Sequence, residues 1–237
     1  RKRFSNMRVN KWLDEKFLKL SELKRLQDFV LGNDDSVLHV TGIAGSFFSY
    51  MAKSAGSKSE RSTVVICRND EEAKLVYSDF QTLQAQSVYY FPTLSLTPYQ
   101  LGVVSGEIAS KRMEVIRAML SGKRVTVITS LEAVLFTMVP KNVIAEYFKT
   151  IRVGECYEYE DLGRFLVNAG YERVKQVTYP GEFAIRGEII DIYYSSVSSP
   201  VRLDFFDTQI EKIRLFNPDT QKCQDTLEEI TLPPFRE

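Results

Sequence analysis

The stretch from Ser36 to Gly56, SVLHVTGIAGSFFSYMAKSAG, is similar to the start of a nucleotide-binding P-loop. In a P-loop, backbone N–H groups, a helix N-terminus and a lysine surround the phosphates, while a Ser or Thr hydroxyl reaches magnesium. Here Gly42 takes the first glycine position and Ser49 the hydroxyl position, but phenylalanines stand at the second glycine and at the lysine. The chain therefore lacks the cation and carries bulk where the backbone should approach a phosphate.

Three interpretations of this stretch remain open, and they concern Gly42, Gly45, Ser46, Phe47, Phe48 and Ser49. A plain strand–turn–helix corner would use the two glycines for the turn alone. A relic P-loop would keep the geometry without binding nucleotide, and the residues favour this interpretation. An active site would need another cation donor, and Lys53 is a poor substitute because it points away from the loop. We expect no cofactor for this chain.

No other catalytic or metal-binding constellation stands out. The single histidine, His39, lies in an apolar run and is expected in the core or at a strand end. The three cysteines are far apart and in no CxxC spacing, which argues against a zinc site or a disulfide framework and fits a reducing cytoplasm. No apolar run approaches the roughly 20 residues that span a membrane.

The charge balance does not indicate a nucleic-acid-binding protein. Lys plus Arg and Asp plus Glu are both 31, so the formal net charge is zero, whereas duplex DNA binding usually shows a basic footprint. One group of basic residues is expected to be a solvated face around one helix: Lys111, Arg112, Arg117, Lys123 and Arg124.

The periodicity predicts an α/β fold followed by a smaller α+β domain. Residues 10–31 have the spacing of one or two amphipathic helices. Apolar strands are then expected at 37–43, 63–68, 87–91 and 125–130, alternating with helices. That alternation is typical of a RecA-like or P-loop-like, mostly parallel sheet with helices on both faces. Asn69 and Glu72 have the spacing of a capping box at one helix start.

From about residue 148 the pattern changes to strands with little helix. A short helix is expected at 160–170, and strand-like runs at 172–177, 183–194, 201–207 and 209–216 indicate an antiparallel sheet. The predicted domains are a helical segment at 1–32, an α/β domain with a degenerate P-loop at 33–147, and an α+β domain at 148–237.

Several ordered motifs resemble a known family. They are VTGIAGS, LTPYQ followed by EIASKRMEVIRAML, VTVITSLEAVL, LVNAGYERVKQVTYPGEFAIRGEIIDIY, PVRLDFFDTQIEKIRLFNPDTQ and EEITLPPFRE. Together they resemble the N-terminal, UvrB-like module of the bacterial transcription-repair coupling factors (Mfd), over about residues 30–237. The excision-repair protein UvrB itself has the P-loop lysine, and it has a long DNA-clamping hairpin shortly after the third strand. In this chain only TLSLTPYQLGVVSG separates that strand from the next helix, which is too short for such a hairpin. Both departures favour the coupling factors.

The resemblance implies a non-catalytic module. In the family, the smaller domain docks onto UvrA, the damage-recognition ATPase, and so recruits excision repair to a stalled RNA polymerase. Binding of RNA polymerase and double-stranded DNA, and the ATP- and Mg²⁺-dependent motor, lie in other parts of the family's proteins. The rival interpretation is a UvrB-like enzyme that binds and hydrolyses ATP.

The family's UvrA contacts fall on Arg186, Arg202 and Phe206, with Glu188 and Asp204 as charged rim residues. Independently, alternation along 201–206 places Arg202, Asp204 and Phe206 on one face of a strand. The simpler alternative is that Phe206 caps a hairpin, while Arg202 and Asp204 form an ordinary exposed pair. If the contacts are right, alanine at Arg186, Arg202 or Phe206 should weaken UvrA binding and leave unfolding nearly unchanged.

Overall fold

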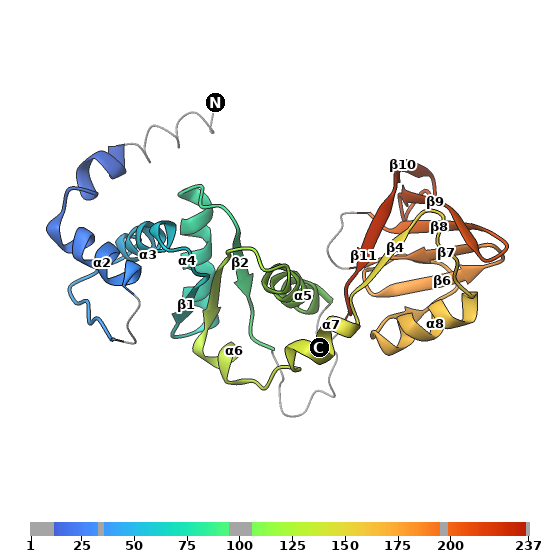
Figure 1. Ribbon diagram of the computed structural model, residues 1–237, viewed down its shortest axis with the longest axis horizontal. Coiled ribbons are helices and arrows are strands. Elements are labelled where there is room, and N and C mark those ends of the chain that lie inside the picture. The colour runs from blue at the N-terminus through green and yellow to red at the C-terminus, as the bar shows by residue number, and fades with distance from the viewer. Residues whose placement is uncertain (1–11, 33–35, 95–105, 195–198, 236–237) are drawn as a thin grey trace. The chain divides into compact units, whose positions relative to one another are not determined.

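The computed structural model describes residues 12–32, 36–94, 106–194 and 199–235. They form two compact units, shown in Figure 1: one built from residues 1–93 and 121–136, and one from 94–120 and 137–237. The predicted domain limits at residues 32 and 147 stay predictions.

The first unit begins with two helices, as the spacing predicted. Residues 12–17 are helical, and α2 (Ser21–Leu31) follows after a short turn. Leu23 of α2 is buried against Tyr50 and Met51 of α3 (Phe47–Lys58). The apolar faces of these helices therefore pack on one another.

A three-stranded parallel sheet forms the centre of this unit. Its order is β1 (Thr63–Cys67), β3 (Thr126–Ser130), β2 (Val88–Phe91), and α4 (Asp70–Thr82) packs on one face through Ala73, Val76 and Phe80. The short helix α6 (Leu131–Leu135) follows β3 directly. The parallel α/β part of the prediction is thus confirmed. On the other face, Val64 and Ile66 of the edge strand β1 are over half exposed, whereas Val127 and Thr129, which lie opposite them on β3, are buried.

The predicted buried strand at 37–43 is wrong. These residues are not assigned to a strand, and Val37 is 78% exposed. Leu38, Val40 and Ile43 instead line an apolar cavity of about 580 Å³ together with β1. The residues of this apolar run therefore form part of a cavity wall and do not form a strand of the sheet. His39 is exposed, so its predicted core position is also wrong.

The second unit contains the predicted antiparallel sheet. Six strands lie in the order β10-β9-β8-β7-β6-β5, antiparallel except for β5 with β6, and β11 pairs with β4 separately. The elements of this unit are α5 (Gly106–Leu120), α7 (Lys141–Glu146), β4 (Lys149–Arg152), α8 (Tyr159–Asn168), β5 (Glu172–Arg173), β6 (Glu182–Arg186), β7 (Ile189–Ile192), β8 (Val201–Phe206), β9 (Gln209–Phe216), β10 (Cys223–Leu227) and β11 (Glu229–Leu232).

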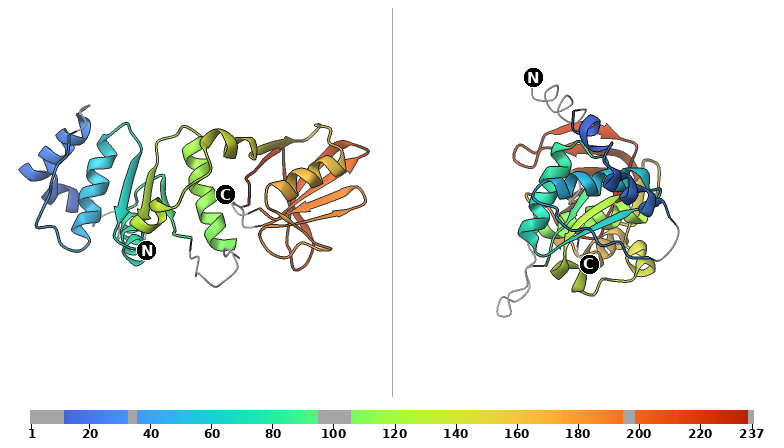
Figure 2. Two further views of the ribbon diagram at one scale, coloured as in Figure 1. Left: turned by 90° about the horizontal axis from the view of Figure 1, so that it is seen from below. Right: turned by 90° about the vertical axis from the view of Figure 1, so that its left-hand side faces the viewer.

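Helix α8 covers one face of the six-stranded sheet, as Figure 2 shows. Leu162 and Leu166 on the helix are buried against strand residues that include Phe183 and Leu203. At Gly163 a Cβ atom would lie 3.1 Å from Cδ1 of Ile185, so glycine permits the close approach of helix and strand. The side chains that alternate with this core point to the opposite face, which holds the candidate site.

Candidate functional site

The P-loop-like stretch forms a turn and a helix start, but its polar group is engaged elsewhere. Gly42 and Gly45 have φ of 78° and 56°, values that favour glycine, and α3 begins at Phe47. Ser49 is 1% exposed, and its hydroxyl donates a 2.8 Å hydrogen bond to Oδ2 of Asp79 on α4. In this structure the serine hydroxyl therefore links two helices.

The two phenylalanines occupy different surroundings. The ring of Phe47 lies 5.0 Å from that of Phe17 and 6.2 Å from that of Tyr50, measured between centroids, so Phe47 is a packing residue. Phe48, which stands at the lysine position, is 39% exposed and lines the apolar cavity beside β1.

The alternation predicted for β8 is confirmed. Val201, Leu203 and Phe205 are buried in the core beneath α8, while Arg202 and Asp204 are half-buried and Phe206 is exposed. Because Asp191 of β7 lies opposite Arg202 in the sheet register, it belongs to the same face. We call this side of the sheet the arginine face; it carries Arg186, Asp191, Arg202, Asp204, Phe206 and Arg214.

Two arginines of the arginine face converge on one buried carboxylate. Asp191 has no exposed surface, and Arg202 donates to it from Nε at 2.7 Å and from Nη2 at 2.9 Å. Nη2 of Arg186 donates to the same carboxylate. The hydrogen bonds to Asp191 raise the pKa of Arg202 above its ordinary value. Since the Arg202 side chain is only 12% exposed and that of Arg186 is 41% exposed, Arg186 presents far more of itself to a partner.

A second ion pair lies beside the first. Arg214 of β9 donates to both carboxylate oxygens of Asp204, at 2.7 and 2.6 Å, and these bonds raise the pKa of Arg214. The guanidinium of Arg202 also stacks over the ring of Phe216, 4.6 Å from its centroid. Arg202 and Asp204 therefore do not form the exposed pair that the simpler alternative assumed, because each is bound to another residue.

Phe206 stands at a hairpin end and is nevertheless the most exposed apolar side chain of β8, at 74%. It pairs with Gln209 across the two-residue turn that joins β8 to β9, where Asp207 has a positive φ of 55°. Glu188 lies in the neighbouring β6–β7 turn, and its carbonyl accepts from the N–H of Phe205 at 2.9 Å. Phe206 and Glu188 are thus brought to the same end of the sheet.

The sequence prediction missed the residues that hold this face together: Asp191, Arg214 and Phe216. A signal for Asp191 was present, because it is an acidic residue between two isoleucines in a strand expected to be apolar. A buried carboxylate of this kind needs a cationic partner. No comparable local signal identified Arg214, since its pairing depends on the strand register.

The predicted solvated basic face is confirmed for four of its five residues, because Lys111, Arg117, Lys123 and Arg124 are exposed. It is wrong for Arg112, which is fully buried. Lys111 forms an exposed ion pair with Glu107, and Arg124 donates to the carbonyl of Ser59 at 2.6 Å.

Within the described ranges, no group of three or more metal-ligating side chains comes together, and none of the helices could cross a membrane. The three cysteines are all unpaired: Cys67 is buried and Cys156 exposed, with Cys223 between them in exposure.

The domain that carries the arginine face is similar to a known family. Residues 150–237 match the UvrB interaction domain family. The chain is also similar to bacterial proteins named transcription-repair-coupling factor. It is 32% identical over 228 residues to that of Bacillus subtilis (strain 168), covering 91% of this chain and 19% of that protein. For Staphylococcus haemolyticus (strain JCSC1435) the identity is 30% over 212 residues, covering 88% and 18%.

The resemblance predicted from the motifs is therefore confirmed: the chain is similar to the UvrB-like module of the transcription-repair coupling factors. The chain spans about a fifth of the length of these relatives.

Proposed function

We propose that this chain is a non-catalytic module that binds UvrA through the arginine face and thereby recruits nucleotide excision repair to a stalled RNA polymerase. The observation that carries the proposal is Phe206, which is 74% exposed on the arginine face of a domain matching the UvrB interaction family. Arginine and aromatic residues are the usual anchors of protein interfaces.

The exposed fractions divide the predicted contacts into two groups. Phe206 and Arg186 offer accessible side chains to UvrA, and Glu188 is exposed beside them. Arg202 and Asp204 are mostly covered and hold the face in shape through Asp191 and Arg214. We therefore propose Phe206 and Arg186 as direct contacts and Arg202 and Asp204 as positioning residues.

The P-loop-like stretch is proposed to be a relic, in a cytoplasmic protein that needs no cofactor here. Two observations support this: the lysine position is Phe48, and the Ser49 hydroxyl is bonded to Asp79. Other parts of a coupling factor would bind RNA polymerase and double-stranded DNA and would contain the ATP-driven motor. The second candidate, a UvrB-like ATP-hydrolysing enzyme, rests on the retained turn at Gly42 and Gly45.

One experiment separates the two functions. The purified 237-residue chain is titrated with UvrA and, separately, with ATP and Mg²⁺, and heat is measured in both titrations. The proposal expects a saturable complex with UvrA and no ATP turnover. Micromolar ATP binding with turnover, and no complex with UvrA, would establish the enzyme instead.

A further inference from the structure

A second candidate site lies in the first unit, at the amino ends of the three parallel strands. A cavity of about 310 Å³ opens there between the end of α3 and the segment that follows α4. Thr63, Ser87 and Thr126, at the starts of the strands, form part of its wall, and Phe80 and Val125 form its apolar floor. The volume is at the lower end of the range of small-ligand pockets.

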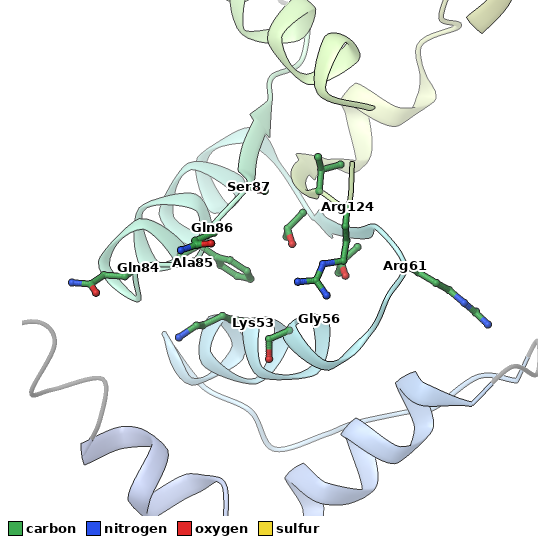
Figure 3. Close-up of a pocket in the computed structure, with 13 residues that line it drawn as sticks. Lys53, Gly56, Arg61, Gln84, Ala85, Gln86, Ser87 and Arg124 are labelled. Atoms are coloured by element: carbon green, nitrogen blue, oxygen red, sulfur yellow. The ribbon is translucent and has the colours of Figure 1, made fainter. Parts of the chain in front are cut away.

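The charged residues that line this cavity are all positive. Its charged side chains are Lys53, Arg61 and Arg124, and no carboxylate of the described residues lines it. Glu60, in the adjoining loop, is not part of the wall. In Figure 3 the guanidinium of Arg124 lies in the space beside Gly56, while Arg61 is turned away. Lys53 lines the cavity from α3, and in the same view its ammonium is directed away from Arg124.

Arg124 is held in place before any ligand arrives. Its Nη1 donates to the carbonyl of Ser59 at 2.6 Å. The loop carrying that carbonyl is braced in turn, since Ser59 Oγ accepts from the N–H of Arg61 and Ser62 Oγ accepts from the N–H of Val125. A guanidinium has five N–H donors, so most of those of Arg124 stay available. A preorganised fork of this kind matches the oxygens of a phosphate group.

Two helix C-termini near the cavity offset only part of the positive charge of its lining. Helices α3 and α4 both end near the cavity, and a helix C-terminus carries about −0.5 charge that a cation stabilises. Two such ends offset roughly one positive charge, while Lys53 and Arg124 carry two.

We propose that this cavity binds a small ligand with a terminal, dianionic phosphate group, held by Arg124 and Lys53. Arg124 supplies bidentate hydrogen bonds and Lys53 supplies a point charge. The hydroxyls of Ser87 and Thr126 lie in the wall to complete the coordination. This site is separate from the P-loop-like turn and from the arginine face.

The test is calorimetric titration of the whole chain with pyrophosphate at low ionic strength, where exposed charges are least screened. The variants are Lys53→Gln and Arg124→Gln. Lys58→Gln is the matched control, because it removes the same charge from the same helix outside the cavity. We expect about a tenfold or greater loss of affinity for each of the two cavity variants, as for a charge-assisted hydrogen bond. Lys58→Gln should bind like the unchanged chain.

Dimethyl phosphate is titrated as a second probe, because it carries one charge and represents a phosphodiester. It should bind much more weakly than pyrophosphate. Should Arg124→Gln unfold, the chemical shifts of the Ser87 and Thr126 amides during titration of the unchanged chain and of Lys53→Gln give the same answer. Absence of saturable pyrophosphate binding, equal losses in all three variants, or equal affinity for dimethyl phosphate would overturn the proposal.

Discussion

Arg202 donates two hydrogen bonds to Asp191, a carboxylate with no exposed surface, from the adjacent strand. Arg202 therefore stabilises the sheet, by binding a buried carboxylate, in addition to lying on the arginine face. This pair alters the expectation that alanine at Arg186, Arg202 or Phe206 would leave unfolding nearly unchanged, because one of the three supports a buried charge.

Arg202→Ala should therefore lower the free energy of unfolding by about 2 kcal/mol, because it removes two hydrogen bonds to buried Asp191 and leaves that carboxylate with Arg186 alone. Arg186→Ala should cost about 1 kcal/mol or less, because its side chain is 41% exposed and Asp191 keeps Arg202. Hydrogen exchange of the β7 and β8 amides is the suitable measurement, since the single tryptophan, Trp12, lies in the other unit. Equal losses for both variants would contradict this assignment.

Phe48→Lys restores the missing P-loop cation but should not restore nucleotide binding. Phe47 still fills the second glycine position, and the Ser49 hydroxyl remains bonded to Asp79. Because Phe48 is 39% exposed, the variant should fold normally. Calorimetric titration with ATP and Mg²⁺ should show no affinity beyond that of the unchanged chain. Micromolar affinity in this variant would mean that only the lysine had been lost.

The glycines of the second unit differ sharply in what they tolerate. At Gly181, where φ is +94°, an added Cβ would lie 2.8 Å from Cε2 of Phe235 and closer still to two other ring atoms. Gly181→Ala should cost about 3 kcal/mol, from a strained backbone and overpacking together. Gly187→Ala is the matched control, with φ of +58° and no atom within 4 Å, and should cost about 1 kcal/mol. Denaturant unfolding followed by far-ultraviolet circular dichroism compares them, and similar midpoints would refute the predicted clash.

The start of α4 should lose stability in acid. Glu72 accepts hydrogen bonds from the backbone N–H and the side chain of Arg68, and these bonds hold its pKa below the ordinary 4.5. A lowered carboxyl pKa contributes stability above the unfolded value, and that stability is lost as the pH falls through the folded pKa. Protection of the first-turn amides should therefore differ between the unchanged chain and Glu72→Gln at pH 7, and the difference should shrink at pH 3. A difference independent of pH would exclude this carboxylate as the cause.

The sequence predicted the regular elements well where hydrophobic periodicity and capping agreed. Asn69 caps α4 as expected, accepting from the N–H of Glu72 at 2.9 Å. Glu72 completes only half of the predicted capping box, because its carboxylate turns back to the N–H of Arg68 and not to that of Asn69. The run at 37–43 failed because apolar residues that line a cavity have the same local pattern as a buried strand.

The sequence predicted which residues of β8 share a face, but it did not predict how their side chains pair with other strands. Alternation along β8 placed Arg202, Asp204 and Phe206 on one face, and the structure agrees. Their different exposures arise from cross-strand partners, Asp191 on β7 and Arg214 on β9. Those contacts depend on strand register between distant segments, which periodicity within one strand does not define.

The most direct test of the central claim is the affinity of UvrA for the unchanged chain and for Phe206→Ala. Phe206 is 74% exposed, so its truncation should leave the fold intact. Val167→Ala is the control, an apolar side chain 55% exposed on α8 at the opposite face of the sheet. We predict that Phe206→Ala loses about 2 kcal/mol of binding free energy, about thirtyfold in affinity, while Val167→Ala binds UvrA unchanged. Undiminished binding by Phe206→Ala would contradict the assignment of the arginine face as the UvrA-binding surface.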